Sequence, residues 1–223
     1  MLARHRGVMN IPEHYGTITA HIYAMIAHVD QQAGRVLEAV KRLGREDDTI
    51  VVFSSDHGHW HGDHGLAGKG GLLTRGLVRT PLLIRVPGSR SAGNAARSLV
   101  SAVDLMPTLL ELLGQPVPPG LDGRSFAALF GDPAQPHRGH VRIEWMEAAL
   151  GAQAVQIRTE RHALTRYAPS GETLLFDLER DPMERWNFWP RQADEGDVMR
   201  LEAALLDEGK ALLGNRSKPW ARC

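Results

Sequence analysis

The sequence predicts an α/β domain followed by a smaller subdomain built on an antiparallel sheet. The run 49–53 is β-branched and aromatic without polar alternation, which is typical of a strand covered on both faces, and 82–86 is predicted to be a second buried strand. Beyond residue 140 the strand-like segments become short and are separated by turn residues, as expected of an antiparallel sheet. This change along the chain predicts two different layers of structure.

The N-terminal part is expected to supply one long helix before the first strand. Residues 1–16 are polar and interrupted by glycine and proline, which predicts a leader or loop. From residue 17 to 43 apolar side chains recur at helical spacing, and Gly44 stands where a C-terminal cap belongs. His21 and His28 lie on this amphipathic helix, and we expect them to be surface or supporting residues rather than metal ligands.

Helix and loop signals follow the second strand. A helix is predicted from near Asp104, with Pro107 in its first turn, which makes Asp104 a cap rather than a catalytic carboxylate. The proline-rich stretch 114–123 predicts a loop, and 125–130 a short helix. A further segment rich in proline and glycine, 131–139, marks the boundary before the C-terminal subdomain.

The C-terminal subdomain is predicted to be a four-stranded sheet followed by a helix over 197–213, whose apolar residues share one face. The expected strands are 141–146, 154–159, 162–167 and 173–178. Four aromatic residues near the end of the chain are expected to pack into the core or an interface, namely Trp186, Phe188, Trp189 and Trp220.

Length and composition narrow the function classes. With 223 residues the chain has room for one large domain and an appendage, and we divide it into a leader or loop (1–16), an α/β part (17–135) and a C-terminal subdomain (136–223). The 26 basic residues only balance the 26 acidic ones, which argues against a nucleic-acid partner. A single cysteine, Cys223, permits no internal disulfide. No signal-like start or membrane-length apolar run occurs, so we expect a soluble chain with no membrane partner and leave its compartment open.

The most informative segment, 54–70, follows the first strand directly and contains four histidines, two aspartates and one lysine. Because ligands of open α/β sheets gather at the carboxyl ends of strands, this segment predicts an active-site loop. Asp56 and His57 offer a carboxylate oxygen and an imidazole nitrogen to one divalent cation. Lys69 offers a positive charge to an anionic substrate. Taken alone, the cluster leaves a metal site and a solvated histidine-rich turn as equal alternatives.

Five further segments give this loop a context. They are 23–37 before it, and 79–88, 103–114, 121–126 and 174–187 after it. In that order and at that spacing they resemble the C-terminal half of the sulfatase family, within the alkaline-phosphatase-like superfamily. The resemblance implies part of the alkaline-phosphatase-like three-layer sandwich, with a small antiparallel-sheet subdomain at its C-terminal end. It also implies a hydrolase that acts on sulfate esters, with a sulfated small molecule or glycan as the partner.

The resemblance assigns roles within the loop. Asp56 and His57 correspond to metal ligands, with calcium as the expected cation and magnesium, manganese and zinc as alternatives. Lys69 corresponds to the residue that contacts the sulfate group. On proximity alone, His64 or His61 is a candidate for the acid that protonates the leaving oxygen.

The chain departs from the family pattern in ways that bear on catalysis. It has no C/S-x-P-x-R motif, whose cysteine is converted in the family to the formylglycine nucleophile, and it lacks the paired aspartates and the Lys-x-His segment. We therefore expect a C-terminal portion that depends on an N-terminal segment and has no independent activity. At Thr74-Arg75, where related proteins tend to place Tyr-Glu, substrate contacts are expected to differ. A phosphate or phosphonate ester hydrolase of the same superfamily, and a non-catalytic metal-binding remnant, are the alternatives.

Overall fold

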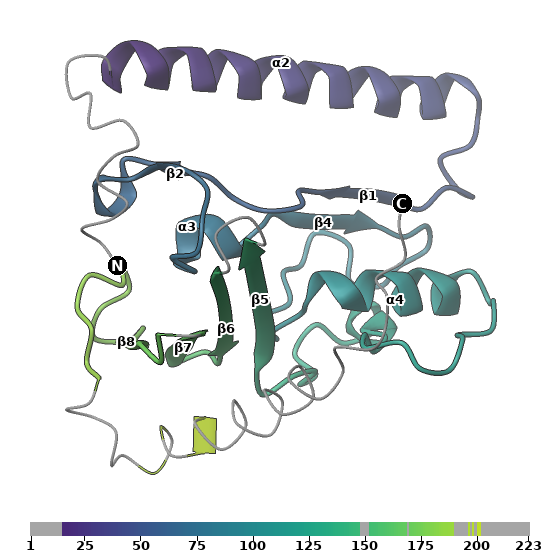
Figure 1. The fold of residues 1–223 in the computed structure, drawn as a ribbon. Helices are drawn as coiled ribbons and strands as arrows, with labels where there is room; N and C mark the ends of the chain where they lie inside the picture. Colours follow the sequence, from purple (N-terminus) through teal and green to yellow (C-terminus); the bar gives the residue numbers. More distant parts are fainter. Residues whose placement is uncertain are drawn as a thin grey trace. The chain divides into compact units, whose positions relative to one another are not determined.

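The structure is a computed structural model that describes residues 15–147, 152–168, 170–189, 196, 198, 200 and 201 (Figure 1). The chain forms two compact units, which are described separately. The first contains 1–69, 76–96 and 126–135, and the second contains 70–75, 97–125 and 136–223. The division into 1–16, 17–135 and 136–223 stays a prediction.

Helix α2 (Tyr15–Arg42) of the first unit confirms the long helix predicted from the sequence. It ends where expected, because Gly44 adopts a left-handed φ of 64°. The Gly44 amide donates to the Lys41 carbonyl at 2.9 Å and the Arg45 amide to the Val40 carbonyl at 3.1 Å, which is the hydrogen-bond pattern of a Schellman cap. No residue described in α2 is buried, and His21 and His28 are exposed, as predicted.

The two predicted strands of the first unit form an antiparallel pair. Strand β1 (Val51–Ser54) pairs with β4 (Leu82–Arg85), and Phe53 lies opposite Leu83. Our expectation that both faces would be covered is wrong for this structure, because Phe53 is 43% exposed and Leu83 is 61% exposed. The physical reason is the size of the sheet: among the described residues these strands have no further strand beside them.

A short hairpin continues the first unit after β1. Its strands β2 (Trp60–His61) and β3 (Ala67–Gly68) flank the single 3₁₀ turn η2 (Asp63–Gly65). The one-turn helix α3 (Arg75–Val78) follows, and the chain crosses from the second unit back to the first within it. The short helix predicted over 125–130 is present as the 3₁₀ turn η4 (Ala127–Phe130).

The second unit confirms the predicted antiparallel sheet. Strands β5 (Val141–Glu147), β6 (Ala152–Arg158), β7 (His162–Ala168) and β8 (Thr173–Asp177) pair in sequence order. Its core cluster consists of Ile157, Leu164, Leu175, Val198 and Leu201. Most of the helix predicted over 197–213 lies outside the described residues, although Val198 and Leu201 are helical and buried.

The aromatic residues that were expected to pack near the end of the chain have different outcomes. Phe188 and Trp189 pack against this core cluster, as expected. Trp186 does not, because its side chain is 69% exposed while its backbone amide donates to Asp181 Oδ2 at 2.7 Å. The turn that follows β8 therefore fixes the backbone of Trp186 and leaves the ring in solvent. Trp220 lies outside the described residues.

Helix α4 (Leu105–Leu112) begins after the 3₁₀ turn η3 (Ala102–Asp104), with Pro107 in its first turn as predicted. Asp104 is fully buried, and its carboxylate does not cap α4. It accepts instead from the Ser101 and Arg124 amides, both at 2.9 Å, and from the Arg138 guanidinium. Asp104 is therefore a structural carboxylate, as expected: it caps η3 through a capping box with Ser101 rather than capping α4, and it also binds Arg124 and Arg138.

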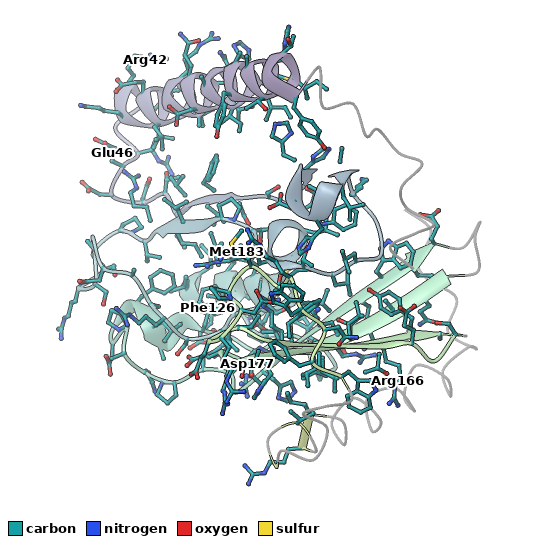
Figure 2. The ribbon with its side chains drawn as sticks, turned by 90° about the vertical axis from the view of Figure 1, so that its left-hand side faces the viewer. Arg42, Glu46, Phe126, Arg166, Asp177 and Met183 are labelled. Atoms are coloured by element: carbon teal, nitrogen blue, oxygen red, sulfur yellow. The ribbon has the colours of Figure 1, made fainter. Side chains whose placement is uncertain are left out.

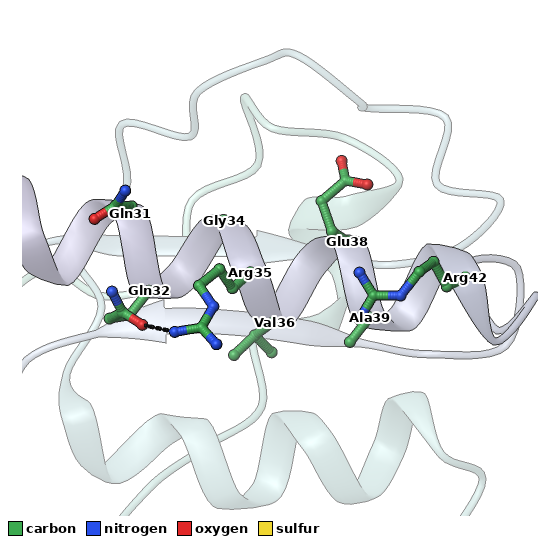
Figure 3. Close-up of a pocket in the computed structure, with 8 residues that line it drawn as sticks. All are labelled: Gln31, Gln32, Gly34, Arg35, Val36, Glu38, Ala39 and Arg42. Atoms are coloured by element: carbon green, nitrogen blue, oxygen red, sulfur yellow. Dashed lines mark hydrogen bonds between the residues drawn. The ribbon is translucent and has the colours of Figure 1, made fainter.

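No helix of the described part of the chain is both long enough and apolar enough to cross a membrane. A shallow hollow lies against α2 and is lined only by residues of that helix (Figure 3). Because one helix cannot enclose a ligand, this hollow is an open helix face rather than a binding pocket.

Candidate active site

The candidate site begins where β1 ends. Ser54 holds this end to the neighbouring strand, since its hydroxyl donates to the Pro81 carbonyl at 2.9 Å. The backbone amide of His57 donates to Asp56 Oδ1 at 2.8 Å, which turns the chain back on the Asp56 side chain. This hydrogen bond lowers the pKa of Asp56 below its ordinary value. The exposed carboxylate of Asp56 is therefore kept in its charged form.

The contacts of His57 define its tautomer. Nδ1 lies 2.8 Å from the Gly58 carbonyl, which can only accept, so Nδ1 carries the proton. In the neutral ring Nε2 is then an acceptor, and the Lys69 ammonium donates to it at 3.1 Å. Asp56 Oδ2 lies 3.5 Å from the same nitrogen. Two of the predicted residues, Asp56 and Lys69, therefore lie close to the Nε2 atom of a third, His57.

This geometry is compatible with two ligands to a common cation. Two ligands at right angles around a cation, each about 2.4 Å from it, lie roughly 3.4 Å apart. The 3.5 Å separation of Asp56 Oδ2 and His57 Nε2 matches that spacing. The Gly58 carbonyl orients the imidazole as the supporting partner of a metal-binding histidine usually does. Among the described residues, however, no group of three or more potential ligands gathers, and the role of Asp56 and His57 as metal ligands stays a prediction.

The other loop histidines are placed differently. Thr19 donates its hydroxyl to the Tyr15 carbonyl at 2.6 Å, so its oxygen accepts from His61 Nε2 at 2.8 Å. The Tyr15 ring meets the His61 ring edge-on, with centroids 6.2 Å apart. His61 therefore joins the first turn of α2 to the hairpin, and its Nε2 is occupied.

His64 has a left-handed backbone with φ 55° and is half-buried. Within the described part of the chain, no hydrogen bond or ion pair connects it to Asp56, His57 or Lys69. The contacts thus join three of the four predicted site residues, and the role of His64 as an acid stays a prediction.

Sequence reasoning missed how closely Gly58 approaches α3. The Gly58 amide donates to the Leu77 carbonyl at 2.7 Å, and a Cβ on Gly58 would lie 2.0 Å from the Gly76 carbonyl oxygen. Any side chain at position 58 would therefore displace either α3 or the loop 55–59, which carries His57 and is called the His57 loop below. The paired glycines 58 and 76 are the only signal in the sequence, and a turn explains them equally well.

Sequence reasoning also missed Glu184. Its side chain is fully buried, its Oε1 forms an ion pair with Arg158, and its Oε2 accepts from the backbone amide of Arg75, the first residue of α3. Buried carboxylates are rare unless they are paired in this way. Glu184 therefore holds the start of the helix against which Gly58 packs.

The segment between Lys69 and α3 is held by the second unit's sheet. Tyr167 donates its hydroxyl to the Gly71 carbonyl at 2.9 Å, and Gln156 donates its amide to the Leu73 carbonyl at 2.7 Å. Burial raises the pKa of Tyr167 well above its ordinary value, so its hydroxyl remains a donor. These two backbone positions, Gly71 and Leu73, lie within four residues of Lys69 in the chain.

Two family models match the chain. The sulfatase model matches residues 5–115, and the model described as N-sulphoglucosamine sulphohydrolase, C-terminal, matches residues 62–210. The arylsulfatase of Clostridium perfringens is 32% identical over 193 residues, which cover 85% of this chain and 39% of the relative. The N-acetylglucosamine-6-O-sulfatase of Bacteroides thetaiotaomicron is 30% identical, with 83% and 34% covered.

A solved structure, the phosphonate monoester hydrolase of Agrobacterium radiobacter, superimposes with a TM-score of 0.71 at 34% identity, covering 91% of this chain and 42% of that one. The fold is that of the alkaline-phosphatase-like superfamily, as the sequence predicted. The chain spans between a third and just over two fifths of the length of these three proteins. Its matches to both family models establish that the chain belongs to the sulfatase family.

Proposed function

We propose that this chain forms the cation-binding and sulfate-binding part of a sulfuric ester hydrolase. The observation that carries the proposal is the convergence of Asp56 Oδ2 and Lys69 Nζ on His57 Nε2, at 3.5 and 3.1 Å. Two of these groups are ligands for a divalent cation, and the third is a cation suited to an oxyanion. Family membership makes a sulfuryl group the expected oxyanion.

Each residue has a separate task in this proposal. Asp56 and His57 would hold the cation, with calcium first and magnesium, manganese or zinc as alternatives, and the bound cation would neutralise negative charge on the sulfuryl oxygens. The Lys69 ammonium, which contacts His57 Nε2 in the structure, would instead donate to the sulfuryl oxygens, because their negative charge attracts it. The Gly58 carbonyl keeps His57 in the tautomer whose Nε2 is an acceptor.

The nucleophile has to come from elsewhere, because the sequence has no C/S-x-P-x-R motif from which formylglycine is made. We propose that an N-terminal sulfatase segment supplies it and binds the pair β1–β4. The exposed apolar side chains of that pair, Val52, Phe53 and Leu83, support this, since exposed apolar surface marks sites of association. A segment that adds strands beside β1 would also cover these side chains.

The substrate class follows from the relatives as a proposal. Both curated relatives are named as sulfatases, one for aryl sulfates and one for a 6-O-sulfated amino sugar. We propose a sulfate ester of a small molecule or glycan as the substrate. At Thr74-Arg75, where related proteins tend to place Tyr-Glu, we expect substrate contacts to differ from those of the relatives.

Phosphonate ester hydrolysis is the second candidate. The observation that favours it is the 34% identity to a solved phosphonate monoester hydrolase over 91% of this chain. A carboxylate, an imidazole and a lysine serve a phosphoryl oxyanion as well as a sulfuryl one. Competing rates on matched aryl sulfate and aryl phosphonate esters separate the two functions.

The test is complementation. The 223-residue chain is mixed with an N-terminal segment from a sulfatase relative that carries formylglycine, and hydrolysis of an aryl sulfate is measured with and without that segment. We expect turnover only in the mixture, reduced at least about a hundredfold by Lys69→Ala and less by Lys69→Arg, which keeps the charge. Robust turnover by the chain alone, abolished by Asp56→Ala, would contradict the need for a second segment. Equal rates for the mixture made with the parent chain and the mixture made with Lys69→Ala would overturn the proposed site.

A further inference from the structure

The buried carboxylate of Glu184 has an unusual backbone as well as unusual burial. Its side chain is 0% exposed, and its φ of 55° is left-handed, which costs a non-glycine residue about 1 kcal/mol or more. Such a conformation persists only where the surrounding contacts over-determine it. Those contacts include the bond from the Glu184 amide to the Asp181 carbonyl at 2.9 Å, the ion pair with Arg158 and the hydrogen bond from the Arg75 amide.

The Arg75 amide is one of the first, unpaired amides of α3. Helices leave these amides without a partner inside the helix, and a charged acceptor stabilises them. Here the acceptor comes from a residue 109 positions away rather than from the preceding residue. A four-residue helix has little stability of its own, so this contact stabilises the first residue of α3 in its helical conformation.

From α3 a continuous set of hydrogen bonds leads to His57. The Leu77 carbonyl accepts from the Gly58 amide at 2.7 Å, and the Gly58 carbonyl accepts from His57 Nδ1 at 2.8 Å. The same peptide plane of Gly58 is further fixed by its contact with Gly76, which leaves no room even for a Cβ. A shift of α3 therefore moves the carbonyl that selects the imidazole tautomer.

We propose that Glu184 is a positioning residue for the His57 imidazole. By capping α3 it fixes Gly58, and the Gly58 carbonyl, together with the Lys69 ammonium that donates to Nε2, then keeps His57 protonated on Nδ1. The inference deepens the proposed function, and it rests on His57 acting as a ligand through Nε2. A purely structural Glu184 would change stability and leave the tautomer of His57 untouched.

The first test removes the Arg75 amide proton with little other change. Arg75→Pro deletes the donor at the first position of a helix, where proline is well tolerated. Arg75→Ala is the matched control, because it loses the same side chain and keeps the amide. The His57 ring is observed in the full chain by nitrogen-15 NMR at one pH where imidazoles are neutral, and its signals are assigned with His57→Gln.

We expect the Nδ1-protonated form in the parent chain and in Arg75→Ala, and a mixture rich in the Nε2-protonated form in Arg75→Pro. Glu184→Ala should behave like Arg75→Pro, whereas Glu184→Gln, which keeps an acceptor oxygen, should restore the parent signal. Asp104→Asn serves as the control for loss of an unrelated buried carboxylate and should leave the signal unchanged. An unaltered His57 signal in both Arg75→Pro and Glu184→Ala would overturn the inference.

A second readout ties this inference to the site. In the chain complemented with the N-terminal segment, loss of the orienting partner should weaken Mn²⁺ binding about tenfold in Arg75→Pro relative to Arg75→Ala. Equal Mn²⁺ affinities of these two variants would contradict a positioning role. Failure of the proposed function appears separately, as no dependence of Mn²⁺ binding on Asp56 and His57, and the NMR result is independent of it.

Discussion

His57 takes its tautomer from a backbone carbonyl next to it in the chain, while its partners Asp56 and Lys69 come from the two ends of the histidine-rich loop. At this scale the sequence was informative where residues are close along the chain. Asp56, His57 and Lys69 followed from the strand, the loop and the family resemblance, and contacts join all three. Their assignment as metal and sulfate ligands stays a prediction.

Residues that act across long separations were not predictable. Glu184 and the Arg75 amide are 109 positions apart, and His61 and Thr19 are 42 apart. No local pattern in the sequence marks either pair, because a glutamate in a segment of mixed charge and a threonine on a helix are both ordinary. Only the folded chain shows that one is buried and that the other occupies the Nε2 atom of a candidate acid.

Gly58 provides a prediction at the residue scale. Gly58→Ala places a Cβ 2.0 Å from the Gly76 carbonyl oxygen, so α3 or the His57 loop has to shift. We expect a loss of about 1–3 kcal/mol in the free energy of unfolding, measured by urea denaturation. Gly34→Ala is the control, since open space surrounds Gly34 on α2 and alanine there should stabilise the helix by up to about 1 kcal/mol. Coincident urea curves for Gly58→Ala and the parent chain would show that the close approach is absent.

The pattern of short strands and turns located the elements of the second unit correctly, whereas apolar composition did not predict how far β1 and β4 are buried. The four strands of the second unit appear within two residues of their expected bounds, because short alternating runs separated by turn residues have few other structures open to them. Strands β1 and β4 were located correctly, but their apolar composition overstated their cover. Composition indicates what a strand would bury in a complete sheet, and the described residues supply only a pair.

The helix α4 was predicted correctly, whereas the hydrogen bonds that Asp104 makes to distant segments were not predicted. Burial by itself raises the pKa of Asp104, but hydrogen bonds from Arg138 and from the Arg124 and Ser101 amides outweigh it and lower the pKa to about 2. The carboxylate thus stays charged inside the protein. Its hydrogen bonds join η3 to Arg124, which is 20 residues away in the chain, and to Arg138, which is 34 residues away.

Asp104 gives a pH-dependent prediction for this element. Because its folded pKa is below the unfolded value, its charge contributes stability above about pH 4, and that contribution is lost as the pH falls toward 2. Asp104→Asn should therefore cost on the order of 2 kcal/mol at pH 7 and markedly less at pH 2, as measured by urea unfolding of variant and parent at both values.

The control for this experiment is Asp122→Asn, which changes an exposed carboxylate in the neighbouring loop and should leave stability nearly unaltered at both pH values. A cost of Asp104→Asn that is the same at pH 2 as at pH 7 would contradict the assignment of its charged form to the buried hydrogen bonds.

The chain combines a four-stranded sheet that carries a buried core with a two-stranded pair that exposes apolar side chains. The second unit buries a core on its sheet, whereas α2 and the β1–β4 pair of the first unit expose apolar side chains. The chain also spans at most about two fifths of the length of the relatives described above. These two facts together support the proposal that a further sulfatase segment binds the strand pair.

Leu83 tests that proposal at the scale of the molecule. Because Leu83 is 61% exposed, Leu83→Lys should change the unfolding free energy of the chain alone by no more than about 0.5 kcal/mol. It should nevertheless reduce complementation by the N-terminal segment at least about tenfold, since a lysine cannot be buried there without a partner. Leu121→Lys, at an exposed loop position of the second unit, should leave complementation unchanged. Equal complementation by the two variants would place the binding surface elsewhere.

The central claim is that Asp56 and His57 hold the cation next to Lys69, and calorimetry with Ca²⁺ and Mn²⁺ tests it most directly. The isolated chain should bind these ions weakly, because two protein ligands fill only part of a coordination shell. The chain complemented with a sulfatase N-terminal segment should bind them tightly, and the Asp56→Ala, His57→Ala double variant should lose that tight binding while still associating with the segment. Tight binding that persists in the double variant would contradict the account, because the cation would then be held by other residues.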